Sequence, residues 1–497
     1  MKSIALCILC LFLHFTSEGK YAFDFNKNCQ DAHSAIGNLR FNEARLIIQK
    51  EKKLHPENLI CLYLENYIDF LSIIISEEKS RFDALKKNKD LRLQILKLGD
   101  KNSPYYLLTQ AEINLQWAFA RIKFSEYITA AFEVNKAYEA LEENQKKFPD
   151  FILTKKSLGL LHAVIGSIPN SYQWAVKMLG FSGTVKQGEK EIMEVFTASL
   201  SNEAYASYQS ETTLLLSIAE LNLGNNENFV KKTILPLLEK KSNPSPIDVF
   251  CYANNCLKLS KPAEAIAYLQ KNTFGKDVFP FHYLNFLLGQ AKLSLLDKNA
   301  DIPLLQFINQ FKGRNYIKAA YLRLAWLGLI KGDETKYQYY LLKVRQNGCE
   351  MVDEDKQSMR ECNDKELPNV SLLKARLLYD AGQYQRALSE LETIDLVSLH
   401  SSKTKLEYTY RKGRIHQKQH NLMSAIKCYL QTIDNGKEEA FYFAANSALQ
   451  LGLIYEELKS YEKARYYFNL CQNMKNKEYQ TSIGQKAKAG LNRLTNQ

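Results

Sequence analysis

The segment LGLIYEELKSYEKARYYF, residues 451–468, carries the spacing that decides the fold. Its small residue Gly452 is followed by the bulky Tyr455 three positions later. Ala464 comes after twelve positions and the bulky Phe468 after sixteen. Small residues let two helical backbones approach closely, and bulky residues fill the gap between one helix pair and the next. The segment therefore predicts a pair of antiparallel helices.

The same spacing recurs along the chain. It returns at Gly413, His416, Ala425 and Tyr429, at Ala375, Leu378, Ala387 and Leu391, and also within residues 253–269, 125–165 and 32–56. A helix pair leaves an apolar face uncovered, so that several pairs must stack to bury it. We expect an all-α fold with nearly no strand, built from about a dozen such pairs.

This pattern resembles the tetratricopeptide repeat family, whose helix–turn–helix unit carries small and aromatic residues in the same order. The resemblance is strongest from Ala375 to Cys471 and weakest over 275–345. It implies a right-handed superhelical solenoid of antiparallel helix pairs. By fold analogy it also implies a non-catalytic scaffold or adaptor that binds a protein or peptide in its concave groove.

One block interrupts the array. Gly166-Ser167-Ile168-Pro169 stops a helix, and Leu179-Gly180-Phe181-Ser182-Gly183 and Gly188 follow it. The block 158–190 is similar to the Iml inclusion-body-clearance family of tetratricopeptide proteins, although Thr184-Val185 replaces the acidic-basic pair of that family. The similarity implies a helical hairpin that carries an irregular insert.

These observations divide the chain into six segments. They are a signal peptide (1–19), N-terminal helical repeats (20–165), an irregular insert (166–190), divergent helical repeats (191–345), a polar loop (346–368) and C-terminal tetratricopeptide-like repeats (369–497).

The first segment reads as an export signal. Lys2 precedes an apolar run over residues 4–13, and Ser17-Glu18-Gly19 supplies small residues at the cleavage positions. We expect cleavage after Gly19 and a secreted or periplasmic protein. The apolar run is too short to span a bilayer, and no later run is long enough. We therefore expect no transmembrane helix after cleavage, and the sequence leaves association with a membrane surface as an alternative.

Composition excludes several classes of protein and partner. The 497 residues are 46% hydrophobic and 24% charged, which does not fit a disordered chain. The formal net charge of +12 comes from 66 basic and 54 acidic residues spread over helical segments. Basic runs such as Lys50 to Lys53 fall near helix ends, where cations suit the helix dipole. We therefore expect no nucleic-acid partner.

Cysteines offer one candidate disulfide. An exported chain permits disulfides, and Cys349 and Cys362 flank a polar stretch that a bridge would close as a loop. Cys251, Cys256 and Cys471 have apolar neighbours that suit buried thiols. The sequence alone does not choose among the other pairings.

The sequence contains no recognisable catalytic or metal-binding motif. The chain contains no H-E-x-x-H, G-x-S-x-G or G-x-G-x-x-G motif. His416 and His420 have the spacing of two metal ligands on a helix, but His416 occupies a packing position of its repeat and His420 falls in a turn. His162 also occupies a packing position. We expect no catalytic residue, no metal and no cofactor.

The first helices of the best repeats supply the candidate binding residues. Their inward positions are Asn369, Arg376, Tyr379, Tyr410, Arg414, Gln417 and Asn446. Amide and guanidinium groups can bind backbone carbonyls or carboxylates, while tyrosine rings cover apolar side chains. A polar surface without a ligand is one alternative. Another is a lipid- or polymer-handling component of the cell envelope with an apolar pocket near Trp174 and Phe181.

Overall fold

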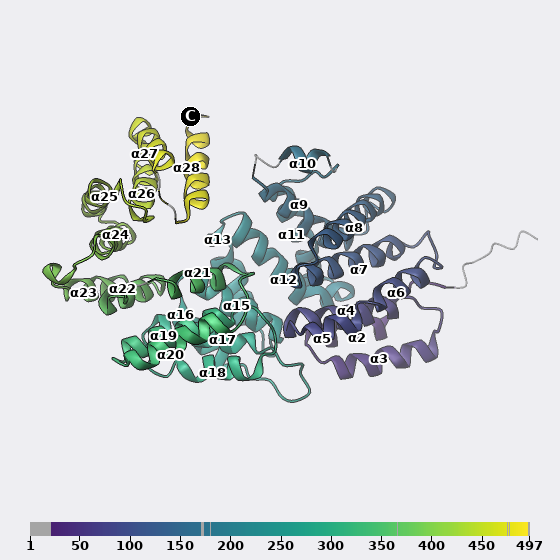
Figure 1. Cartoon of the computed structure of the whole chain (residues 1–497). Helices are drawn as coiled ribbons and strands as arrows, with labels where there is room; N and C mark the ends of the chain where they lie inside the picture. The colour runs from purple at the N-terminus through teal and green to yellow at the C-terminus, as the bar shows by residue number, and fades with distance from the viewer. Residues whose placement is uncertain are drawn as a thin grey trace, which may run out of the picture. The chain divides into compact units, whose positions relative to one another are not determined.

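The computed structural model describes residues 21–169, 173–178, 180–364, 366–474, 476 and 478–495. Throughout these ranges the chain is all-α, which confirms the predicted fold class (Figure 1). The only strand-like pairings among them are two isolated bridges, Tyr21 with Gly99 and Ala22 with Asn58. None of the described helices is long and apolar enough to cross a membrane. The predicted signal segment 1–19 lies outside the described residues, as do Tyr172 and Leu179.

The chain divides into two compact units. The N-terminal unit comprises residues up to 259 together with 264–288 and 305–315. The C-terminal unit comprises 260–263, 289–304 and the residues from 316 onward. This division passes through the segment 191–345, where the sequence analysis placed no boundary.

The N-terminal unit is built from short and medium helices. They are α2 (Lys27–Gly37), α3 (Phe41–Leu54), α4 (Ile60–Ser76), α5 (Lys79–Leu85), α6 (Asn88–Leu96), α7 (Pro104–Lys123), α8 (Tyr127–Lys147), α9 (Thr154–Ser167), α10 (Gln173–Met178), α11 (Val185–Ser201), the 3₁₀ helix η2 (Glu203–Tyr208), α12 (Gln209–Ile218), the π-helix η3 (Ala219–Leu223), α13 (Glu227–Phe229), the π-helix η4 (Val230–Ile234), α14 (Leu235–Glu239) and α15 (Pro246–Lys258). Pairs such as α2 with α3 and α7 with α8 pack against each other. Buried rings of Trp117 and Phe82 anchor the core beside α7.

Glycines bring α9 and α11 into close contact. A Cβ atom on Gly188 would lie 2.2 Å from the carbonyl oxygen of Gly159, and one on Gly166 would lie 2.4 Å from the backbone nitrogen of Val185. Only glycine permits such an approach. The predicted hairpin is therefore present, but the insert ends earlier than position 190 because α11 begins at Val185.

The C-terminal unit holds the strongest repeats. Three helices contribute residues to both units, α16 (Pro262–Lys271), α17 (Tyr283–Ser294) and α18 (Asp301–Gln310). The remaining helices of this unit are α19 (Ile317–Ile330), α20 (Glu334–Gln346), α21 (Asp353–Cys362), α22 (Val370–Asp380), α23 (Tyr384–Glu392), the 3₁₀ helix η5 (Leu396–Ser398), α24 (Ser402–Lys418), α25 (Leu422–Gly436), α26 (Phe443–Glu457), α27 (Tyr461–Asn473) and α28 (Gln480–Thr495).

The repeat spacing is confirmed as helix pairs. A Cβ atom on Gly452 of α26 would lie 2.5 Å from the ring of Phe468 on α27. One on Gly413 of α24 would lie 2.9 Å from the ring of Tyr429 on α25. The small residue of the first helix thus makes room for the ring sixteen positions later, and both rings are fully buried.

The predicted polar loop at 346–368 is wrong, because α21 occupies its middle. Acidic residues in the first turn of α21 suit the positive end of its dipole. Asp355 is fully buried and accepts hydrogen bonds from the backbone nitrogens of Tyr316 (2.6 Å) and Ala319 (2.9 Å). It thereby caps the N-terminus of α19, a contact that fixes α21 against that helix.

The candidate disulfide is also wrong in this structure. Cys349 and Cys362 are not joined. Cys362 is buried at the end of α21, and its thiol donates a hydrogen bond to the carbonyl of Leu341, 3.2 Å away. Cys362 is thus held against α20 by this hydrogen bond. The buried positions expected for Cys251, Cys256 and Cys471 are confirmed.

Candidate functional site

The first helices of the C-terminal repeats share one surface. Helix α24 contacts both α22 and α26, and α26 contacts α28. A cavity of about 290 Å³ lies along these four helices. It is lined by Ala375, Arg376, Tyr379, Asp380, Tyr410, Arg411, Arg414, Tyr442, Asn446, Tyr479, Ser482, Ile483 and Lys486. We call this surface the groove.

Five of the seven predicted binding residues meet in the groove. They are Arg376, Tyr379, Tyr410, Arg414 and Asn446. They come from three successive first helices, and the sequence spacing placed them there because residues three or four apart share a helical face.

The other two predicted residues have different positions. Asn369 caps α22 by accepting a hydrogen bond from the backbone nitrogen of Leu372 (3.1 Å). It lines a second cavity of about 200 Å³, which shares four residues with the groove and extends it. Gln417 accepts a hydrogen bond from the hydroxyl of Tyr429 (2.6 Å), so that it braces α25 and does not line either cavity.

Arg414 is the centre of the groove. Its guanidinium donates to the hydroxyls of Tyr410 (2.7 Å) and Tyr379 (2.8 Å) and lies 5.0 Å from the centre of the Tyr379 ring. Among the described residues, no carboxylate pairs with it. Its positive charge is therefore held in place by two neutral rings and is not neutralised by an ion pair.

The hydroxyls of Tyr410 and Tyr379 lie beside this charge, and each keeps a proton that it can donate to a ligand. The Tyr410 oxygen accepts from Arg414 and also from the side-chain amide of Asn446 (2.9 Å). Two donors thus fill the acceptor capacity of this hydroxyl, and its own proton is left to donate. Burial raises the pKa of the Tyr379 hydroxyl, and the positive charge of Arg414 only partly offsets this rise. The Tyr379 hydroxyl therefore keeps its proton.

The other two arginines of the groove are paired. Arg376 donates to Glu361 (2.9 Å) and lies over the ring of Trp326. Arg411 donates to Glu407 through its Nε atom (2.7 Å). Asp380 is the single carboxylate that lines the groove. Its side chain is exposed at the surface, but the groups packed close to it raise its pKa, and the surrounding arginines oppose that rise.

Sequence reasoning missed part of the groove. Arg411 lies three residues before Arg414, and Tyr442 lies four before Asn446, so helical spacing could have found both. Tyr479 and Lys486 belong to α28 and its start, beyond the last well-formed repeat, and no spacing signal marks them. The rings of Tyr442 and Tyr479 meet edge to face at 5.3 Å, and both line the groove.

The histidines have packing roles. His162 is buried, as its packing position predicted, and its Nδ1 lies 2.6 Å from a carboxylate oxygen of Glu191. His420 occupies a turn with a positive φ of 59°. Within the described ranges no group of His, Cys, Asp or Glu is arranged to hold a metal ion.

Trp174 and Phe181, the residues named for an apolar pocket near the insert, lie in different surroundings. The Trp174 side chain is 66% exposed. Phe181 packs its ring against the edge of Tyr138, 4.9 Å away. Neither side chain lines any of five well-formed cavities among the described residues.

A comparison of the chain with models of known protein families and with curated proteins found no match.

Proposed function

We propose that the groove binds an extended segment of a protein partner, and that the chain is a non-catalytic scaffold or adaptor. The observation that carries this proposal is the convergence of Arg376, Tyr379, Tyr410, Arg414 and Asn446 on one cavity. The fold analogy with tetratricopeptide proteins supports it but does not identify the partner.

The chemistry of the groove favours a peptide with an acidic side chain or a free carboxylate. Arg414 offers N–H donors in a planar fork, which matches a carboxylate. The tyrosine hydroxyls can donate to backbone carbonyls. The rings of Tyr442 and Tyr479 offer apolar cover for the peptide's own side chains.

The successive contacts among α22, α24, α26 and α28 are consistent with a right-handed solenoid across these repeats. We also propose that the chain is exported, on the sequence signal at residues 1–19. N-terminal sequencing of the protein purified from its own cells should then begin at Lys20. A protein that retains Met1 would contradict export by cleavage.

Selection from a phage-displayed random peptide library tests the binding function. We expect enriched peptides that share an acidic residue and that lose binding to the Arg414→Ala variant. Arg386→Ala is the matched control, since Arg386 is exposed on α23 outside the groove. Recovery of no enriched peptide, or of peptides that bind Arg414→Ala equally well, would refute the proposal.

A further inference from the structure

A separate cavity, of about 720 Å³, lies in the C-terminal unit. Its walls come from η5, α24 and α25, and we call it the basic cavity. It is lined by Leu396, Leu399, Ser402, Lys405, Leu406, Tyr408, Thr409, Lys412, His416, Ser424, Lys427, Cys428, Gln431 and Asn435. None of these residues lines the groove, so that the two sites occupy different faces of α24. The volume falls within the range of small-molecule sites.

Three lysines and no carboxylate line the basic cavity. Four other well-formed cavities among the described residues each have at least one carboxylate in their lining. In the part of the chain that the structure describes, no ion pair joins Lys405, Lys412 or Lys427 to a carboxylate. The wall of the basic cavity therefore carries positive charge that the protein itself does not neutralise.

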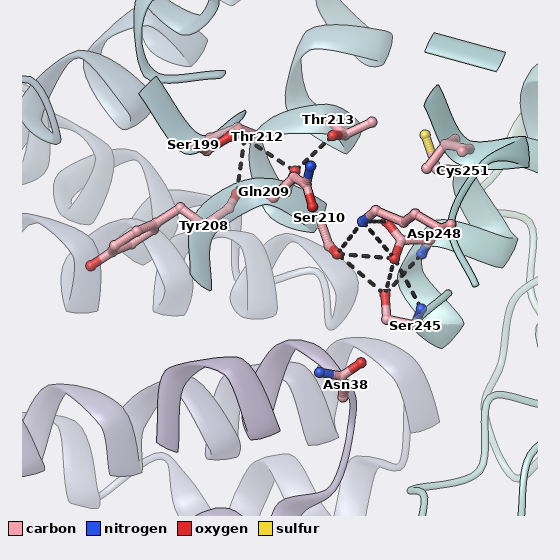
Figure 2. A network of polar contacts seen from close by, with 12 residues as sticks. Asn38, Ser199, Tyr208, Gln209, Ser210, Thr212, Thr213, Ser245, Asp248 and Cys251 are labelled. Atoms are coloured by element: carbon pink, nitrogen blue, oxygen red, sulfur yellow. Dashed lines mark hydrogen bonds and ion pairs between the residues drawn. The ribbon is translucent and has the colours of Figure 1, made fainter. Parts of the chain in front are cut away.

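A cavity in the N-terminal unit provides a contrast. Figure 2 shows Ser210 and Ser245 beside Asp248, whose carboxylate accepts hydrogen bonds from their hydroxyls at 3.0 and 2.9 Å. Lys241 lines that cavity, but it donates to both carboxylate oxygens of Asp248, at 2.9 and 3.0 Å. Its charge is neutralised within the protein, whereas the lysines of the basic cavity keep theirs for a ligand.

Two neighbouring groups respond to the positive charge of the basic cavity. Burial raises the pKa of the half-buried Cys428 thiol, and the ammonium groups of Lys412 and Lys427 oppose this rise. Burial and the Lys412 charge lower the pKa of His416, against the opposing charge of Glu392. The His416 ring is therefore neutral at pH 7, and the lysines supply the charge that faces a ligand.

Apolar side chains line the same cavity. Leu399 and Leu406 are buried, but Leu396 is 54% exposed. Exposed apolar surface that lines a cavity is a feature of ligand-binding sites. Water or a small inorganic anion would leave this leucine uncovered. The combination of unpaired ammonium groups and uncovered apolar surface therefore favours a ligand that has both an anionic and an apolar part.

We propose that the basic cavity binds an anionic amphiphile with a single alkyl chain, the chemistry of a fatty acid. Lys405, Lys412 and Lys427 would donate charge-assisted hydrogen bonds to its carboxylate. Leu396 and Leu399 would contact the alkyl chain and remove its surface from water. This site goes beyond the proposed peptide binding, because it lies on a different face of α24.

Isothermal titration of decanoate into the full mature chain tests this site. Acetate, which has the same head group without the chain, and decyltrimethylammonium, which has the same chain with a positive head group, are the comparison ligands. We expect saturable binding of decanoate alone. The double variant Lys412→Glu/Lys427→Glu should lose at least about tenfold in affinity, because the ligand carboxylate then meets two negative charges.

The double variant Lys418→Glu/Lys437→Glu is the matched control. Lys418 is the last residue of α24 and Lys437 follows α25 directly. Both are exposed and neither lines the basic cavity, so that the control makes the same change in net charge outside the site. It should bind decanoate like the wild type. Circular dichroism should show both double variants folded.

Thiol labelling of the wild-type chain locates the ligand without any substitution. Among the described cysteines, Cys349 and Cys428 are the two that are not buried. Cys428 lines the basic cavity and Cys349 does not. Saturating decanoate should slow the reaction of Cys428 with N-ethylmaleimide and leave the reaction of Cys349 unchanged, as measured by peptide mass spectrometry.

Several results would overturn the proposal. They are absence of decanoate binding, equal binding of acetate or decyltrimethylammonium, equal affinities of the two double variants, and unchanged labelling of Cys428 at saturating decanoate. Binding of a hexaglutamate peptide without binding of decanoate would assign the cavity to a protein partner and would also overturn it.

Discussion

The guanidinium of Arg414 on α24 donates a hydrogen bond to the hydroxyl of Tyr379 on α22, across 2.8 Å. This contact joins two successive repeats through their first helices. Because the partner is a neutral hydroxyl, Arg414 keeps its charge exposed to the groove while its orientation is fixed. The contact therefore has a structural role between repeats and leaves a charge available to a ligand.

The helix-pair packing predicts the effect of enlarging Gly452. A methyl group at this position would overlap the Phe468 ring, which lies 2.5 Å from the Cβ position. We expect Gly452→Ala to lower the free energy of unfolding by about 1–3 kcal/mol in urea titrations. Gly484→Ala should instead raise it by about 0.5–1 kcal/mol, because its Cβ meets nothing and alanine favours the helix. Equal effects of the two changes would refute this packing.

Asp355 caps α19 from a different helix, and this contact predicts a loss of stability when the carboxylate is removed. Asp355→Ala removes the acceptor for the backbone nitrogens of Tyr316 and Ala319 and should cost about 1–2 kcal/mol of stability. Asp353→Ala changes an acidic side chain that is 95% exposed in the same first turn, and should cost much less. Urea unfolding followed by circular dichroism measures both. A loss for Asp353→Ala as large as that for Asp355→Ala would contradict the cap.

The lowered pKa of Glu51 predicts that the free energy of unfolding falls in acid over a specific pH range. Burial alone would raise its pKa, but hydrogen bonds from Asn28, Asn58, Asn26 and His55 lower it from 4.5 to about 2. The folded pKa is thus below the unfolded one, and the stabilisation is complete above pH 4.5. It is lost as the pH falls from 4.5 towards 2, by up to about 3 kcal/mol.

Glu51→Gln tests this window, because glutamine does not titrate. The variant should be less stable than the wild type at pH 7, and the difference should shrink as the pH falls from 4.5 to 2. Glu43→Gln is the control, since Glu43 lies in the first turn of the same helix and its side chain is 53% exposed. Urea titrations across this range measure the difference, and a constant gap for Glu51→Gln would refute the assigned pKa.

Much of the fold could be predicted from the sequence, because the residue spacing that encodes each helix pair lies within a short segment. The spacing of Gly413 and Tyr429, or of Gly452 and Phe468, encodes a contact within one helix pair. The same helical periodicity placed five candidate residues in the groove. The glycines around α9 and α11 indicated an interruption of the array, and the structure adds that they allow the two helices to approach closely.

The features that the sequence did not predict depend on contacts between segments far apart in the chain. No local pattern distinguishes an acidic helix such as α21 from an acidic loop, because its stability rests partly on Asp355 bonding to the start of α19. Gln417 shares the periodicity of Arg414 but faces Tyr429 of the following helix. In the N-terminal unit, a cavity of about 390 Å³ is lined by positions from His33 to Asp248, which no repeat spacing could connect.

The most direct test of peptide binding is a comparison of affinities at Arg414. Isothermal titration of a selected acidic peptide into the wild type, Arg414→Ala, Arg414→Lys and Arg386→Ala chains separates charge from shape. We expect Arg386→Ala to bind like the wild type, Arg414→Lys to bind more weakly because lysine lacks the planar fork, and Arg414→Ala to lose at least about tenfold in affinity. Equal affinities for all four chains would contradict the assignment of the groove as the binding site.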